Sequence, residues 1–157
     1  MKVRAAAIAA FALSIALGTT GCGLMTYQAT TAHYDPSDGV SAQVGDVSVR
    51  NVILISNGEK GATLLLAAVN HHDSPATVSV SVAGERTGLG SFTVDGNSSV
   101  SFGGDASSKA PVLETLKAEP GTLVKLYLQY GSAEGQTLQV PVLDGRLPEY
   151  KQFASTK

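Results

Sequence analysis

The stretch Ala76-Thr-Val-Ser-Val-Ser-Val-Ala83 alternates strictly between apolar and polar side chains. Val78, Val80 and Val82 share one face, and the small polar residues between them share the other. Successive side chains of a β-strand point to opposite faces, so the pattern predicts a strand with one buried and one exposed face. This is the clearest signal of a half-buried strand in the chain.

Further strands are predicted along the rest of the chain after residue 39. The predicted strands are 39–44, 47–56, 63–70, 91–94, 98–102, 122–130 and 136–143. The segment 47–56 begins with alternation and ends in the continuous apolar run Val52–Ile55, which indicates burial on both faces. Asp95-Gly96-Asn97 predicts a tight turn that joins 91–94 and 98–102 in a hairpin. Residues 112–117 fit either a short helical turn or a strand.

Short strands at regular spacing, without a long helix among them, are typical of a β-sandwich. We therefore expect one all-β domain over residues 40–144, an antiparallel immunoglobulin-like sandwich of about seven or eight strands. The chain has no tryptophan and one cysteine, so the disulfide core of antibody domains is excluded. Residues 145–157 show no period and are predicted to form a C-terminal tail that either lies on the surface or is loose.

The N-terminus has the features of an export signal. Lys2 and Arg4 precede the apolar run 5–17, which is too short for the roughly 17–25 residues that span a bilayer. Small residues then lead to Cys22, the only cysteine of the chain. This arrangement predicts a bacterial lipoprotein signal peptide over residues 1–21, cleaved before Cys22. A chance cysteine is the alternative.

Lipidation of Cys22 would anchor the protein to the extracytoplasmic face of the cell membrane. A diacylglyceryl group alone supplies the two acyl chains that stable attachment needs. The polar residues up to 39 would then form a flexible tether between the lipid and the sandwich. The 11 basic and 13 acidic residues argue against a nucleic-acid partner.

His71-His72-Asp73 is the one cluster with metal-ligand chemistry. Adjacent side chains that leave a strand point to opposite faces, so we expect exposed turn residues and no metal site there. A weak surface site for zinc or copper(II) is the alternative. The carboxylates that could serve catalysis fall in predicted loops, where they are expected to be solvated: Glu85, Asp95, Asp105, Glu114, Glu119 and Glu134. The chain lacks a G-x-S-x-G elbow, and we expect no enzyme activity and no cofactor.

The order of these segments resembles small actinobacterial cell-envelope lipoproteins of the LpqE type. The resemblance lies in Val44-Gly-Asp-Val-Ser-Val-Arg-Asn-Val52, Val69-Asn70, Pro120-Gly121 and Val140-Pro141-Val142. It implies a lipid-anchored envelope protein. The motifs concern packing and turns, and they identify no ligand.

The second half also resembles, more distantly, the periplasmic copper chaperone fold PCu(A)C, a cupredoxin-like sandwich. In this resemblance Phe92–Phe102 corresponds to a hairpin, Leu116 to a leucine-rich turn and Gly121 to a glycine before a strand. The family's His-x-Met copper segment falls near Ala110-Pro111-Val112, where neither ligand type is present. The resemblance thus implies the fold without the copper site.

The sequence leads to two functional expectations. The first is a membrane-anchored, non-enzymatic interaction or envelope-maintenance module whose partner is an unidentified envelope protein. The alternative is a metal-handling protein derived from the copper-chaperone fold, with a different or lost site.

Overall fold

The computed structural model of the chain describes residues 2–19, 34–104 and 109–154. It divides into two compact units, Met1–Tyr34 and Asp35–Lys157. In the first unit, helix α1 covers Lys2–Thr19 and contains the predicted apolar run. Within the described ranges, no helix is both long enough and apolar enough to cross a membrane.

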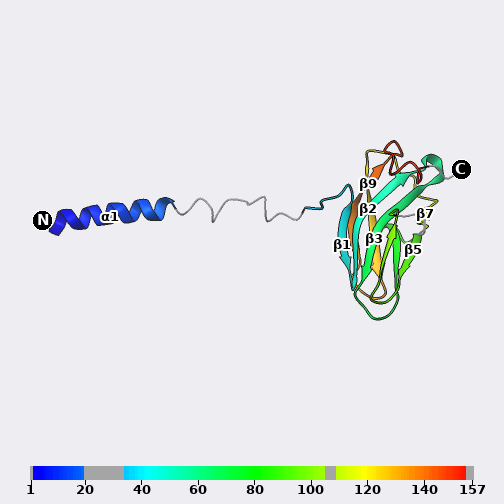
Figure 1. The fold of residues 1–157 in the computed structure, drawn as a ribbon, viewed down its shortest axis with the longest axis horizontal. Helices are drawn as coiled ribbons and strands as arrows, with labels where there is room; N and C mark the ends of the chain where they lie inside the picture. The colour runs from blue at the N-terminus through cyan, green and yellow to red at the C-terminus, as the bar shows by residue number, and fades with distance from the viewer. Residues whose placement is uncertain (1, 20–33, 105–108, 155–157) are drawn as a thin grey trace. The chain divides into compact units, whose positions relative to one another are not determined.

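The second unit is built from β-strands, as predicted (Figure 1). The strands are β1 Val40–Val44, β2 Val47–Ser56, β3 Ala62–Asn70, β4 Ala76–Val82, β5 Gly88–Val94, β6 Ser99–Phe102, β7 Val112–Leu113, β8 Leu123–Tyr130 and β9 Gln136–Leu143. A 3-10 turn, η2, covers Gly58–Lys60. The ambiguous segment 112–117 contains the two-residue strand β7. The all-β sandwich prediction is confirmed.

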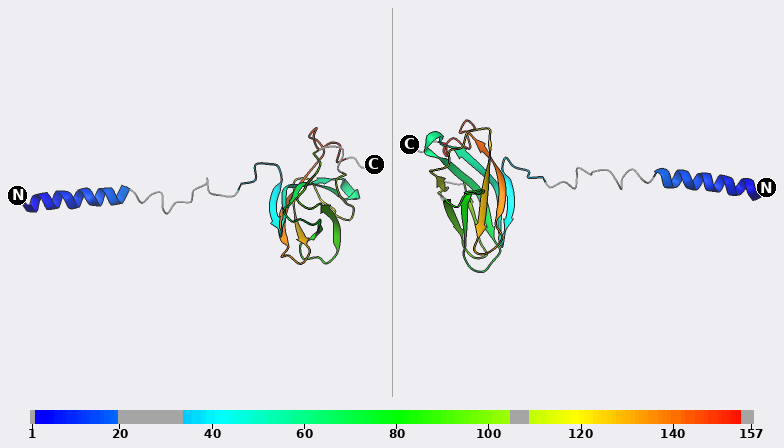
Figure 2. Two further views of the ribbon diagram at one scale, coloured as in Figure 1. Left: turned by 60° about the horizontal axis from the view of Figure 1, so that its bottom comes forward. Right: turned by 180° about the vertical axis from the view of Figure 1, so that it is seen from behind.

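The strands form two layers that are joined along one side (Figure 2). The hydrogen-bonded path is β5-β4-β8-β9-β2-β3-β6, with β1 paired to β2 and β7 paired to β3. Every pairing is antiparallel except that of β2 with β9, where Leu54 faces Val142 and Ile55 faces Leu143. This parallel pair links the layers, so the sandwich is nearly closed into a barrel and stays open between β5 and β6.

The predicted hairpin of 91–94 and 98–102 is wrong. Strand β5 pairs with β4 and β6 pairs with β3, so Asp95-Gly96-Asn97 crosses from one layer to the other. The crossing is fixed at the loop that follows β3. The Asn97 amide donates to the His72 carbonyl at 2.9 Å, and a side chain on Gly96 would lie 2.0 Å from the Asp73 carbonyl oxygen. Residues Asp95-Gly96-Asn97 therefore form a turn, as their sequence indicates, but the turn is held by contacts with the loop after β3 and does not close a hairpin.

The main core lies between the two layers. The alternation of β4 is realised there, since Val78 and Val80 are buried while Thr77 and Ser79 are exposed. Twenty-two buried residues contribute, from Val44 to Val142. None of the buried core residues of the described chain precedes Val44, so the core belongs entirely to the second unit.

A bulge at Asn51 shifts the alternation of β2. Asn51 has a φ of 51°, and the registers of β2 with both β1 and β3 slip by one residue around it. The inward positions therefore change from Val47 and Val49 to Val52 and Leu54. Asn51 tolerates this left-handed conformation better than most residues, and its side-chain oxygen accepts a hydrogen bond from the Gly39 amide at 2.9 Å.

A second cluster covers the outer face of β2 and β3. Ile53, Ile55 and Leu65 are buried there against Tyr150 and Phe153. This contact explains why the run Val52–Ile55 is buried on both faces, as predicted. Of the two alternatives for the predicted tail, the described part lies on the surface, where it covers a sheet face as far as Ala154.

Candidate functional site

Asn70 organises the end of the sandwich where the predicted metal ligands lie. It closes β3 and is 1% exposed. Its side-chain nitrogen donates to the carbonyls of Ser74, Val94 and Asp95 at 2.8, 3.2 and 3.1 Å, while its oxygen accepts from the His72 amide at 3.0 Å. A buried amide is stable only when its polar atoms are paired, so Asn70 fixes the course of both loops at this end.

His71 belongs to a chain of side-chain hydrogen bonds that starts on β1. The Gln43 nitrogen donates to the Gly45 carbonyl at 2.8 Å, so the Gln43 oxygen faces Ser48 and accepts the Ser48 hydroxyl proton at 2.5 Å. Ser48 has one proton to donate, so its oxygen accepts from Nε2 of His71 at 3.1 Å. Nε2 of His71 therefore carries a proton and offers no lone pair to a metal.

His72 and Asp73 are engaged elsewhere in the same loop. Nδ1 of His72 accepts the Ser74 amide proton at 3.1 Å, which leaves the proton of the neutral ring on Nε2. The Asp73 carboxylate accepts from the Asn97 side chain at 2.7 Å. The three residues are exposed turn residues, as predicted. The described part of the chain contains no group of three or more His, Cys, Asp or Glu residues that could hold a metal.

The Ser48–His71 contact does not have the geometry of an activated nucleophile. In a serine hydrolase the histidine accepts the serine proton, whereas here Ser48 donates its proton to Gln43 and accepts one from His71. The candidate carboxylates within the described ranges, namely Glu85, Asp95, Glu114, Glu119 and Glu134, are all exposed, as expected. Asp105 lies outside the described residues.

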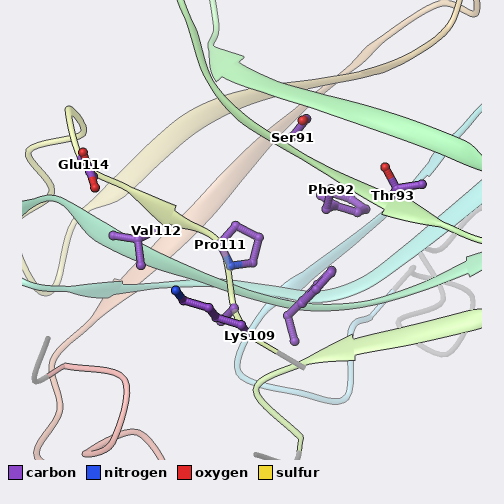
Figure 3. Close-up of a pocket in the computed structure, with 9 residues that line it drawn as sticks. Ser91, Phe92, Thr93, Lys109, Pro111, Val112 and Glu114 are labelled. Atoms are coloured by element: carbon purple, nitrogen blue, oxygen red, sulfur yellow. The ribbon is translucent and has the colours of Figure 1, made fainter. Parts of the chain in front are cut away.

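The candidate binding site is a pocket of about 630 Å³ at the open side of the sandwich (Figure 3). Strand β5 contributes Ser91, Phe92 and Thr93. The opposite wall comes from β6 and from the segment around β7, with Phe102, Lys109, Ala110, Pro111, Val112 and Glu114. The site therefore lies between the two strand edges that the barrel leaves unjoined.

Two phenylalanines form the floor of this pocket. The rings of Phe92 and Phe102 meet edge to face, with centroids 5.8 Å apart and planes at 68°. Phe92 is 5% exposed and belongs to the main core, whereas Phe102 is half-buried and touches both apolar clusters. Lys109 and Glu114 are exposed at the rim and carry opposite charges. The arrangement suits an apolar group that carries polar groups beside it.

This pocket was not predicted from the sequence. Phe92 and Phe102 were predicted to lie in one hairpin, whereas they stand on strands of different layers. Ala110-Pro111-Val112 attracted notice in the sequence only because copper ligands are missing there, and the structure puts these residues in the pocket wall. The available signal for the pocket was the position of Phe92 and Phe102 on either side of the segment that crosses between the layers. That crossing could not be predicted locally, because it depends on pairing between distant strands.

Cys22, the predicted lipidation site, lies outside the described residues. No protein-family model and no curated protein matches the chain. Solved structures similar to it include the copper-bound PCuAC domain from PmoF2, with 19% identity, a TM-score of 0.49 and coverage of 67% of this chain and 98% of that domain. The apo PmoF2 PCuAC domain is similar at 18% identity and a TM-score of 0.49, with coverage of 69% and 98%.

Proposed function

We propose that this chain is a lipid-anchored protein of the bacterial cell envelope, held at the extracytoplasmic face of the membrane through Cys22. Its sandwich acts as a non-enzymatic binding module. The observation that carries the proposal is the sequence 2–22, in which a basic start and a short apolar run precede the only cysteine. The resemblance to LpqE-type lipoproteins supports the same assignment.

The distribution of the core is compatible with removal of the leader. Every buried core residue of the described chain lies in the unit that begins at Asp35. Cleavage before Cys22 would therefore take no core side chain from the sandwich. A polar stretch of about 17 residues, which reaches at most roughly 60 Å when extended, would separate the lipid from β1.

A test of the anchor compares Cys22→Ser with Thr31→Ser, a matched change in the tether. Both chains are expressed in a bacterial host and labelled with an alkyne analogue of palmitate. We expect Thr31→Ser to keep the label and to remain in the membrane fraction, and Cys22→Ser to lose the label because it has no thiol to acylate. Cys22→Ser would then be released or accumulate as the uncleaved precursor. Undiminished labelling of Cys22→Ser would overturn the proposed anchor.

The metal-handling alternative has weaker support from the same residues. The two histidines have different hydrogen-bond partners. His71 bonds to Ser48 through Nε2, and His72 accepts from the Ser74 amide through Nδ1. With its proton on Nε2, His71 keeps the Nδ1 lone pair for an ion, whereas copper(II) or zinc binding at His72 would have to break the hydrogen bond from the Ser74 amide. Calorimetric titration of each ion into the full chain in detergent, compared with the His71→Ala/His72→Ala double variant, separates the two functions. Stoichiometric heat that only the double variant lacks would favour metal handling.

A further inference from the structure

The sandwich has one side that is closed by strand pairing and one that is not. On the closed side, β2 and β9 pair across the layers. On the other side the hydrogen-bonded path ends at β5 and at β6, and among the described strands β5 is paired with β4 alone. We call the gap between β5 and the β6–β7 edge the seam, and the pocket lined by Phe92 and Phe102 lies in it.

We propose that the seam binds an extended peptide segment of a partner protein, which adds a strand to the free edge of β5 and places an apolar side chain in the pocket. The proposal gives the module described above its binding surface, and it rests on the binding function proposed there. It does not depend on the lipid anchor.

The chemistry of the β5 edge selects a peptide backbone. Alternate residues of an edge strand aim their amide and carbonyl groups away from the sheet, at a spacing that another extended backbone matches. Within the described chain, no side-chain acceptor is bonded to a β5 amide. The edge strand β1 differs, because the Asp35 carboxylate accepts from its Ser41 amide at 3.2 Å.

Strand β5 has only one of the devices that usually block strand addition, a register irregularity at its N-terminal end. Such edges carry charged residues, prolines or bulges, whereas Gly88–Val94 (GLGSFTV) has neither charge nor proline. Its one irregularity lies between Gly88 and Gly90, so the register with β4 is regular from Gly90 to Val94. The regular part is the part that lines the seam, through Ser91, Phe92 and Thr93.

The pocket provides room for side chains of the added strand. Its volume of about 630 Å³ lies within the range of small-ligand sites, and its floor is aromatic. Lys109 and Glu114 at the rim have opposite charges, so the site favours neither an anionic nor a cationic small molecule. A strand with an apolar residue facing inward and polar residues around it fits these features, and strand addition with side-chain pockets is a recurrent mode of peptide recognition.

The test begins with selection from a display library of random decapeptides against the full chain in detergent micelles. The best peptide is synthesised, and its affinity is measured by fluorescence anisotropy. It is then remade with single N-methyl groups at successive amides. We expect methylation to reduce affinity about tenfold or more at every second amide and to have little effect at the amides between, because one side of the peptide pairs with β5.

Two surface variants locate the binding site. Ser91→Lys puts a charged side chain at the free edge, and we expect it to reduce peptide affinity by about tenfold or more. Ser79→Lys is the matched control, since Ser79 faces Ser91 in the register and is also exposed, but lies on β4, which is paired on both sides. Circular dichroism checks that both variants fold.

Each outcome decides the proposal. Strand addition is supported if methylation weakens binding at every second amide. It also requires that Ser91→Lys lose peptide affinity and that Ser79→Lys retain it. Binding that is insensitive to methylation overturns it in favour of an apolar ligand pocket, and an absence of enriched peptides overturns it outright. A stable dimer of the full chain that Ser91→Lys abolishes assigns the edge to a second copy and also overturns it. Labelling of Cys22 is measured separately, so failure of the anchor and failure of the seam are distinguishable.

Discussion

Strand β2 buries two adjacent side chains in two different environments. Leu54 points between the layers, into a core made by strands from both, whereas Ile53 points outward and is covered by the segment that follows β9. Both side chains are completely buried. The inner environment is built from sheet pairing, and the outer one depends on a short segment held by a few hydrogen bonds. We therefore expect the outer environment to be less rigid than the inner one, although both side chains are equally buried.

The largest expected effect is that of Leu54→Ala. The cavity would lie between two hydrogen-bonded layers that cannot move together without breaking the β2–β9 pairing. We expect a loss of about 3–5 kcal/mol in the free energy of unfolding, measured by urea denaturation. A loss below about 2 kcal/mol would show that the layers do collapse around the cavity.

Ile53→Ala sharpens the comparison, because it removes a neighbouring side chain of similar size from the other face. The covering segment can move inward and fill part of the cavity, so we expect a smaller loss of about 2–3 kcal/mol by the same measurement. Hydrogen exchange should become faster in residues 147–154 and stay unchanged in β8. Equal losses for the two alanine variants would contradict the difference in rigidity.

Asn51 controls which side chains of β2 face which environment. Asn51→Ala would lose the hydrogen bond to the Gly39 amide and place an alanine at a φ of 51°. We expect a loss of about 1–3 kcal/mol in the free energy of unfolding. Asn51→Gly loses the same bond without the backbone strain, so it should lie closer to the wild type. If Asn51→Gly were less stable than Asn51→Ala, backbone strain would be excluded as the main cause of the stability lost in the alanine variant.

The smallest effect is expected from Tyr150→Phe. The Tyr150 hydroxyl donates to the Asp38 carboxylate at 2.8 Å, an exposed bond whose loss we expect to cost about 0.5–1 kcal/mol near pH 7. Urea denaturation of this variant and of Tyr34→Phe, a matched change in the exposed residue before the sandwich, gives the comparison.

The pH dependence provides a second test of Tyr150. Burial, followed by the hydrogen bond to Asp38, raises the pKa of Tyr150 from the usual 10.0 to about 12. The folded chain therefore favours the neutral phenol, and its contribution to stability is complete below about pH 10 and is lost as the pH rises towards 12. Tyr150→Phe should flatten the fall in stability over this window, while Tyr34→Phe should retain it. An equal fall in all three chains would argue against the assignment.

The strands could be predicted from local patterns because burial imposes a two-residue period. Val78 and Val80 of β4 are an example, and the apolar run of β2 correctly indicated a strand covered on both faces. The contacts by which the C-terminal tail covers that face were not predicted, since Tyr150 and Phe153 are single contacts without a period. The bulge at Asn51 could not be predicted from the sequence either, because its conformation is set by pairing with β1 and β3.

The candidate site was less accessible to prediction than the strands. The exposed position of His71, His72 and Asp73 followed from the turn residues around them. The pocket did not, because Phe92 and Phe102 come together only after β5 and β6 have joined different layers. Local turn chemistry at Asp95-Gly96-Asn97 is the same for a hairpin and for a crossing, and the choice between them depends on the pairing of β5 with β4 and of β6 with β3.

The hydrogen bond between Tyr150 and Asp38 also brings the two ends of the folded body together. Domains whose ends are adjacent tolerate circular permutation. The sandwich could thus be closed into a ring by a short linker from the C-terminal segment to Asp35 and reopened at the exposed loop Gly84–Thr87, between β4 and β5. In such a permutant the new chain start would lie directly before β5, and a tether attached there would leave the body beside the seam.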